Sequence, residues 1–261
     1  MFFALPDTLP PAGLFTAAHG ILLLLAVVGI ALGLFASRRI TEKAARRAVL
    51  WLTALLIALE LCKIAFALFR LKTRNPNEFI PLYFCSITLA AGLFSGAARG
   101  TLRRCGDLFL ATGGIVGGTV FLIVPATSLP RYPAWHFLSL YSFLLHGVMV
   151  YMGVLLLWRG FCRLRWRDLH LAAWPILFTG IAALIFNLTH QLLTGQDVAN
   201  LMFLTRDFPG TPLSDLYRLL PRPLFTLTIL LAQAFGPFLL VFPIVRAVQG
   251  AKRPTSFENR G

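Results

Sequence analysis

The sequence predicts an all-α polytopic membrane protein with seven transmembrane helices. Hydrophobic residues make up 57% of the 261 residues and charged residues only 13%, whereas soluble proteins carry about 25% charged residues. Apolar runs close to the ~20 residues that span a bilayer recur along the chain. The basic residues behind the net charge of +14 lie in short clusters between these runs. This pattern is typical of membrane topology and not of nucleic-acid binding.

The seven predicted spans follow one another with short connections. The first two are long apolar runs, and the second contains Glu60 and Lys63. The third opens with FIPLYFCSITL, residues 79–89, and the fourth contains TGGIVGGT, residues 112–119. The overlapping GxxxG pairs of the fourth span indicate close helix packing, because phosphate-binding glycines lie in a loop before a helix. The predicted ranges are 13–36, 47–69, 80–98, 107–124, 136–158, 170–193 and 223–246.

The distribution of Lys and Arg predicts the orientation. Alternate connecting segments and termini carry sixteen basic residues on one side and seven on the other. The positive-inside rule therefore predicts an N-terminus outside, a cytoplasmic C-terminus and a multi-pass protein of the cell membrane. Its expected partners are membrane lipids, with anionic head groups on the cytoplasmic side, and no nucleic acid. We expect a membrane domain over 1–250 and a short basic cytoplasmic tail over 251–261. The longest connection, 194–222, fits either a re-entrant cap or an ordinary loop.

Polar residues inside the predicted spans are costly and are therefore candidates for function. Glu60 and Lys63 are three residues apart on one helical face, so they can form an ion pair. That pair is either structural or available to orient a His or bind a head-group amine. The predicted topology puts the candidates in the outer half of the membrane or near its middle, which suggests one outward-facing cavity. The candidates are His19, Glu60, Lys63, Cys85, His136, His146, Asn187 and His190.

Cys85 is the candidate nucleophile among the four cysteines. Its predicted place near the start of a helix favours a thiolate, Pro81 suits a first helical turn, and three basic residues precede it. A base on another helix would complete a Cys–His pair, and His146 or His19 could supply it. The alternative is that Cys85 packs as a small hydrophobic residue. No CxxC motif or Cys/His run has zinc spacing, so we expect no metal and no cofactor.

Four short motifs resemble those of the YwaF family of integral membrane proteins, in matching order and spacing. They are PLYFC (81–85), FLLHG (143–147) after LPRYP (129–133), ANLMFL (199–204) followed by PGTPLSDL (209–216), and PRPLF (221–225). The resemblance covers most of the chain. This sequence departs from the family motifs at Tyr83, where the family has His, and at Leu201 and Leu224, where it has Tyr and Trp.

The resemblance implies a function. The eukaryotic branch of the family is similar to acyltransferases that remodel ether phospholipids with a Cys and a His, and more distant relatives resemble hydrolases of fatty acid esters. The matching residues here are Cys85 and His146. An acyltransferase or acyl hydrolase of phospholipid esters would then use Asn187, Asn200 or a backbone amide for the oxyanion, and Lys63 or Arg131 for a phosphate. The alternative is a transporter or binding protein for a lipid or small solute.

Overall fold

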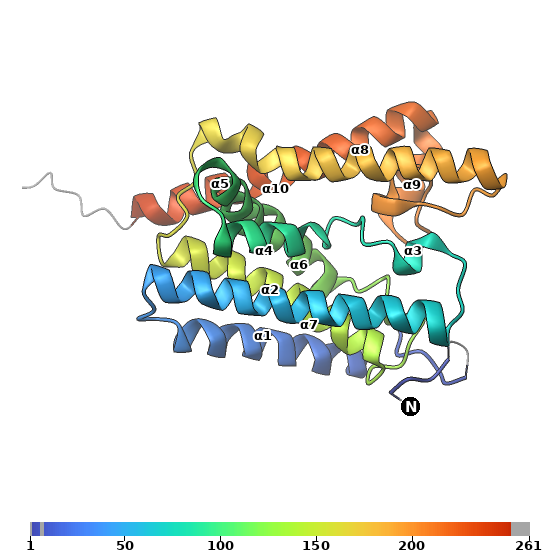
Figure 1. Cartoon of the computed structure of the whole chain (residues 1–261), viewed down its shortest axis with the longest axis horizontal. Helices are drawn as coiled ribbons and strands as arrows, with labels where there is room; N and C mark the ends of the chain where they lie inside the picture. The colour runs from blue at the N-terminus through green and yellow to red at the C-terminus, as the bar shows by residue number, and fades with distance from the viewer. Residues whose placement is uncertain (1, 6–7, 252–261) are drawn as a thin grey trace, which may run out of the picture.

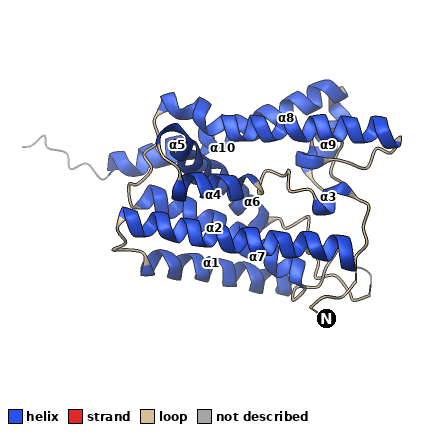
Figure 2. Cartoon of the chain, in the orientation of Figure 1, coloured by secondary structure: helices blue, strands red, loops and turns tan. Residues whose placement is uncertain are grey.

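The computed structural model describes residues 2–5 and 8–251, and all regular structure in this part of the chain is helical (Figure 2). Helices α1, α2 and α7 lie side by side along one side of the bundle, and α8 and α10 lie along the other (Figure 1). Helices α4, α5 and α6 lie between them. The bounds are α1 Ala17–Ala36, α2 Glu42–Ala65, η1 Phe66–Arg70, α3 Pro76–Phe79, α4 Ile87–Ala97, α5 Gly100–Phe109, η2 Leu110–Gly114, α6 Ile115–Ile123, α7 Phe137–Trp158, η3 Trp166–Asp168, α8 Leu169–Thr194, η4 Leu201–Phe203, α9 Pro212–Leu219 and α10 Arg222–Ala251.

Six helical segments of the described chain are long and apolar enough to cross a membrane, which confirms a multi-pass membrane protein. They cover Ala17–Ala36, Glu42–Arg70, Gly100–Ile123, Phe137–Trp158, Trp166–Thr194 and Arg222–Val248. Each matches one predicted span. The fourth begins earlier than predicted, because α5, the π-helical turn η2 and α6 follow one another without a break. The predicted tail over 251–261 lies outside the described residues apart from its first residue.

The third predicted span is not a continuous helix over 80–98. Helix α4 covers only Ile87–Ala97, and residues 80–86 form irregular chain and turns. Pro81 disfavours the helical conformation of Ile80, the residue before it, and so separates this segment from the short helix α3. Pro81 is therefore in a loop and not in a first helical turn. The aromatic side chains of Tyr83 and Phe84 anchor the segment, on Phe203 and on Phe109 respectively.

The GxxxG glycines pack against neighbours, as the sequence predicts. A Cβ on Gly118 would lie 2.7 Å from the carbonyl oxygen of His146, and one on Gly117 would lie 2.6 Å from the ring of Phe84. Such distances leave no room for a larger residue. The glycines of α6 therefore hold α7 on one side and the segment before α4 on the other.

The long connection between α8 and α10 folds back into the bundle at residues 199–205. Leu201, Met202 and Leu204 are at most 1% exposed. Met202 and Phe203 both have left-handed backbone, with φ of 55° and 56°, a conformation that bulky side chains rarely adopt. Side chains of α8 and α10 hold the backbone in place: Asn187 bonds Leu201, and Gln233 Nε2 donates to the Met202 carbonyl at 2.9 Å. The segment is thus packed into the bundle, and its place relative to the membrane stays a prediction. We call residues 199–205 the re-entrant segment.

A buried ion pair joins three helices at the opposite end of the bundle. Arg46 of α2 donates to both carboxylate oxygens of Asp107 in α5. Ser95 of α4 donates to the same carboxylate at 2.6 Å. The side chains of Arg46 and Asp107 are only 10% and 5% exposed, so each charge depends on the other for its compensation.

Asp107→Ala is expected to destabilise the protein by up to about 3–5 kcal/mol, because the buried Arg46 guanidinium then keeps only the exposed Glu42 carboxylate, at 3.1 Å, as its ionic partner. The double variant Arg46→Met/Asp107→Leu removes both charges and is expected to recover most of the loss. Thermal unfolding in detergent measures both variants. A single variant as stable as the wild type would show that the pair does not stabilise the fold.

Candidate functional site

The packing of α4 on α2 brings Cys85 close to Glu60. A Cβ on Gly96 would lie 2.9 Å from Leu50 Cβ, and a Cβ on Gly92 would lie 2.0 Å from Thr53 Oγ1. The two helices therefore run antiparallel: Gly96 of α4 lies opposite Leu50 of α2, and Gly92 lies opposite Thr53. Cys85 lies in the turn just before α4, two residues before its first residue, Ile87. Burial raises the pKa of the Cys85 thiol above its ordinary value, and Lys63, which lowers it, and Glu60, which raises it, are the charged groups near enough to act on it.

Glu60 is the centre of a buried polar cluster. Its carboxylate is 2.6 Å from Lys63 Nζ, and the Tyr141 hydroxyl of α7 donates a hydrogen bond to its other oxygen. Glu60 is 4% exposed and Tyr141 is 5% exposed. These contacts hold Glu60 between α2 and α7, with Oε1 paired to the Lys63 charge but without a hydrogen bond among the described residues. Cys85 itself is half-buried in the turn before α4. We call Glu60, Lys63, Cys85 and Tyr141 the Cys85 cluster.

His146 lies on a different face of α7 from Tyr141. The two residues are five positions apart, which is a rotation of about 140° around the helix axis. The His146 ring stacks on Phe121 of α6 with 3.7 Å between ring centroids, and its Nδ1 is 2.6 Å from the Ser142 carbonyl oxygen. Cys85 is not among the hydrogen-bond or ring partners of His146 in the described part of the chain. The pairing of Cys85 with His146 therefore stays a prediction.

His19, the other predicted base, uses both ring nitrogens elsewhere. Nδ1 accepts the Phe15 amide at 3.2 Å, and Nε2 is 3.0 Å from the Leu122 carbonyl oxygen. His136 is the N-cap of α7: its Nδ1 accepts the Leu138 amide at 3.2 Å, and its Nε2 is 3.1 Å from the Ala4 carbonyl oxygen. Both rings thus fasten backbone segments, and both lie apart from the Cys85 cluster.

The polar residues of α8 and of the re-entrant segment hold the backbone. Asn187 donates to the Leu201 carbonyl at 3.1 Å and accepts the Leu201 amide at 3.0 Å. Asn200 accepts the amides of Thr205 and Arg206 and donates to the carbonyls of Arg206 and Asp207. Both amides thus hold the backbone of this segment, and their role at an oxyanion stays a prediction. His190 Nδ1 is 3.5 Å from the Oγ1 of Thr194, which lies one turn after His190 on α8.

The remaining predicted candidates have structural partners. Arg131, proposed for a phosphate, donates to Glu78 at 2.7 Å. Cys162 is fully buried between α7 and η3, and burial raises the pKa of its thiol to about 12, which makes it a poor nucleophile. No group of three or more His, Cys, Asp or Glu residues in the described chain has a metal-binding arrangement. Of the predicted site residues, the structure brings together Glu60, Lys63 and Cys85.

Sequence reasoning missed two further residues of this region. Tyr141 completes the cluster, and a tyrosine within an apolar span is a signal, because its hydroxyl needs a partner when buried. Thr88 lies three residues after Cys85, and its amide donates to the Cys85 carbonyl at 3.1 Å. The Thr88 side chain is fully buried, and its Oγ1 has no hydrogen-bond partner among the described residues.

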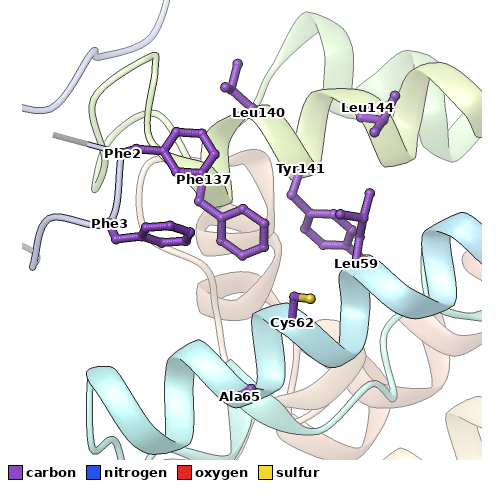
Figure 3. A pocket seen from close by; sticks show the side chains of 9 residues that line it. All are labelled: Phe2, Phe3, Leu59, Cys62, Ala65, Phe137, Leu140, Tyr141 and Leu144. Atoms are coloured by element: carbon purple, nitrogen blue, oxygen red, sulfur yellow. The ribbon is translucent and has the colours of Figure 1, made fainter.

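The Tyr141 ring also lines an apolar cavity on the other side of the cluster (Figure 3). The cavity has a volume of about 560 Å³ and lies between α2 and α7. Phe2 and Phe3 of the N-terminal segment close its outer end together with Phe137 (Figure 3). Tyr141 therefore presents its ring to an apolar space and its hydroxyl to Glu60.

Comparison with known proteins assigns the family. The searches of curated proteins and of solved structures gave no match. The TMEM164 family model matches residues 14–241. This range includes the Cys85 cluster, helices α1 to α9 and most of α10. The match covers most of the chain and, with the six apolar helices, leads to one conclusion: the chain belongs to the TMEM164 family of transmembrane proteins.

Proposed function

We propose that this membrane protein transfers acyl groups from phospholipid esters through the thiol of Cys85. The observation that carries the proposal is the position of Cys85 beside the buried Lys63–Glu60 pair. Burial raises the pKa of the Cys85 thiol, so the thiol needs a base to become a nucleophile, and the Lys63 ammonium opposes that rise. A carboxylate held within reach of a thiol is able to accept its proton. The cluster thus combines a nucleophile, a positive charge and a proton acceptor.

The reaction has two steps. The Cys85 sulfur attacks the ester carbonyl carbon, the thiol proton passes to Glu60, and the protonated Glu60 returns it to the departing lipid alcohol. The acyl group is then held on Cys85 as a thioester. In the second step Glu60 takes the proton of a lyso-lipid hydroxyl or a water molecule, which attacks the thioester and releases the thiol. Tyr141 and Lys63 position the carboxylate throughout.

Two proton acceptors are open to test. Glu60 is favoured because its charge is one of the two that reach the Cys85 thiol. The resemblance of FLLHG to the family motif implies His146 instead. In the present arrangement the His146 ring faces Phe121 and Ser142, so this alternative requires a rotation of the side chain. We treat Glu60 as the proton acceptor and His146 as the competing assignment.

The Thr88 hydroxyl is suited to stabilise the oxyanion. It lies one turn from Cys85 and is buried without a partner among the described residues, so a substrate oxygen would satisfy it. Thr88→Val is expected to lower the acyl-transfer rate about 10²- to 10³-fold. The variant should be at least as stable as the wild type, because, within the described chain, the Thr88 hydroxyl makes no hydrogen bond that the substitution would break. Parallel measurements of turnover and thermal unfolding check both expectations, and an active Thr88→Val variant would remove Thr88 from the mechanism.

The proposal is tested by following a phospholipid with a labelled acyl chain in nanodiscs that contain the purified protein. The proposal predicts a lyso-lipid product together with an acylated acceptor or a free fatty acid. Omission of a lyso-lipid acceptor separates the two: a transferase then slows, and a hydrolase does not. Equal turnover by the wild type and by Cys85→Ala would contradict the proposal.

A second function is supported by one feature of the fold. The discontinuous segment of residues 80–97, an irregular stretch followed by the short helix α4, resembles the broken helices that line transport sites. A lipid or solute transporter, or a binding protein, would use the Cys85 cluster without covalent chemistry. Such a protein would retain its binding after Cys85→Ala and form no acyl adduct.

The cell membrane and the predicted orientation belong to the same proposal. The basic segments around 37–47, 99–104 and 159–167 lie at the end of the bundle that carries the end of α10 (Figure 1). We place this end in the cytoplasm, in contact with anionic head groups. The Cys85 cluster then acts on lipids of the outer leaflet.

A further inference from the structure

An apolar groove runs along α7 from the Cys85 cluster towards the opposite end of the bundle. Its first part is the cavity of about 560 Å³ that Tyr141 lines. Its second part, of about 710 Å³, lies between α1, α2 and α7. Leu140 and Leu144 line both parts, so the two are contiguous. None of the side chains that line either part carries a charge.

Glycines keep the second part of the groove open. A Cβ on Gly29 of α1 would meet no atom within 4 Å, and one on Gly147 of α7 would meet only Ala26, at 3.9 Å. The groove ends near Tyr151, whose hydroxyl is 2.7 Å from Ser37 Oγ. The space is therefore long, apolar and free of side chains in its middle.

The length of the groove matches one lipid chain. Tyr141 and Tyr151 are ten residues apart on α7, which is about 15 Å along the helix axis. One leaflet of the hydrocarbon core is half of ~30 Å, again about 15 Å. One end of the groove lies at the Tyr141 ring, whose hydroxyl bonds Glu60 of the Cys85 cluster. The other end lies at the depth that the terminus of a chain would reach.

We infer that this groove binds one acyl chain of a membrane phospholipid, with its ester end at Tyr141 and its methyl end towards Tyr151. The inference rests on the proposed function. Tyr141 is the one member of the Cys85 cluster that lines the groove, so transfer of this chain requires its ester to pass the Tyr141 ring and reach Cys85. A partner helix is a poorer occupant. Gly29 and Gly33 have the spacing of a helix-dimer motif, but a Cβ on Gly33 would lie 2.9 Å from the Tyr151 ring, so α7 already covers that glycine.

Photolabelling tests occupancy without requiring activity. The wild-type protein in nanodiscs is irradiated with a phosphatidylcholine that carries a diazirine in one acyl chain, and labelled peptides are mapped by mass spectrometry. The expected labels are on α7 and α1 at the groove. Gly29→Leu is expected to reduce them at least about tenfold, since its side chain fills the open space. Gly20→Leu is the matched control, because Gly20 lies on the same helix, also has nothing within 4 Å and does not line the groove.

Three results would overturn the inference. Labels spread evenly over lipid-facing residues such as Phe178 and Leu192 of α8 would show that the groove has no bound chain. Equal labelling of Gly29→Leu and Gly20→Leu would show the same. Labelling by a photoreactive free fatty acid but not by the phospholipid, or a cross-link between two copies of the protein at the groove, would assign a different occupant.

An activity measurement separates this inference from the proposed function. If the groove holds the transferred chain, Gly29→Leu lowers turnover of an 18-carbon substrate at least about tenfold and leaves that of an eight-carbon substrate within about twofold. Gly20→Leu changes neither. Groove labelling in a protein without turnover would support the groove and contradict the enzyme. Turnover whose chain-length profile is the same in both variants would support the enzyme and contradict the groove.

Discussion

Cys85→Ala is expected to lower acyl transfer by at least about 10⁴-fold, the largest effect of any single substitution in this chain. The thiol forms the covalent intermediate, and removal of a nucleophile leaves only the small acceleration from binding. The fold should not change, because alanine keeps the β-carbon in a half-buried turn. Turnover of a labelled phospholipid by the purified variant provides the measurement.

Cys105→Ala is the control for this substitution. Cys105 is a half-buried free thiol of α5 and is not part of the Cys85 cluster. Its replacement is expected to leave turnover unchanged, which excludes a general effect of thiol loss. Retention of activity by Cys85→Ala would mean that Cys85 is a packing residue.

Glu60→Gln is expected to have the second largest effect, a loss of about 10²- to 10⁴-fold in turnover. The amide oxygen still accepts the Tyr141 hydroxyl, so the shape of the site is kept while the proton acceptor is lost. The variant also leaves the Lys63 ammonium without its carboxylate. Thermal unfolding measured beside turnover distinguishes loss of chemistry from loss of fold.

His146→Gln is the variant to compare with Glu60→Gln. If Glu60 is the proton acceptor, His146→Gln retains turnover within about tenfold, because its own contacts are with Ser142 and Phe121. The reverse pattern, an active Glu60→Gln and an inactive His146→Gln, would assign the proton transfer to His146. That result would also require the side chain of His146 to leave Phe121 during the reaction.

The sequence predicted most of the fold because apolar length is a strong signal. Six of the seven predicted spans correspond to helices of sufficient length. The third differs because hydropathy reports burial and not conformation. Residues 80–86 are apolar and packed, but Pro81 prevents a continuous helix there. The seven crossings and the orientation stay predictions.

The site was harder to predict because the depth of a residue along a predicted span does not tell which neighbouring helix its side chain faces. The polar candidates share a depth in the predicted spans, but they face different neighbours. Tyr141 and His146 illustrate this: both are buried in α7, yet one faces Glu60 of α2 and the other faces Phe121 of α6. The meeting of Cys85 and Glu60 depends on the register of α4 against α2, which Gly92 and Gly96 set and which sequence periodicity does not contain.

Asp107 shows a signal that the sequence did contain. An acidic residue within a predicted span is costly and needs a partner. That partner, Arg46, was predicted as part of a loop, because basic residues near span ends are normally interfacial. In the structure α2 begins at Glu42, so Arg46 lies inside the helix and is turned inward. A boundary error of one turn therefore hid a buried ion pair.

Intact-mass spectrometry of the purified protein after incubation with a phospholipid, in the absence of a lyso-lipid acceptor, tests the central claim most directly. The account predicts a fraction of protein heavier by one acyl group, with the acyl group on the peptide that contains Cys85. The adduct should be released by hydroxylamine, as thioesters are, and should be absent from Cys85→Ala. Turnover without an adduct in the wild type, or an adduct on a different cysteine, would contradict it.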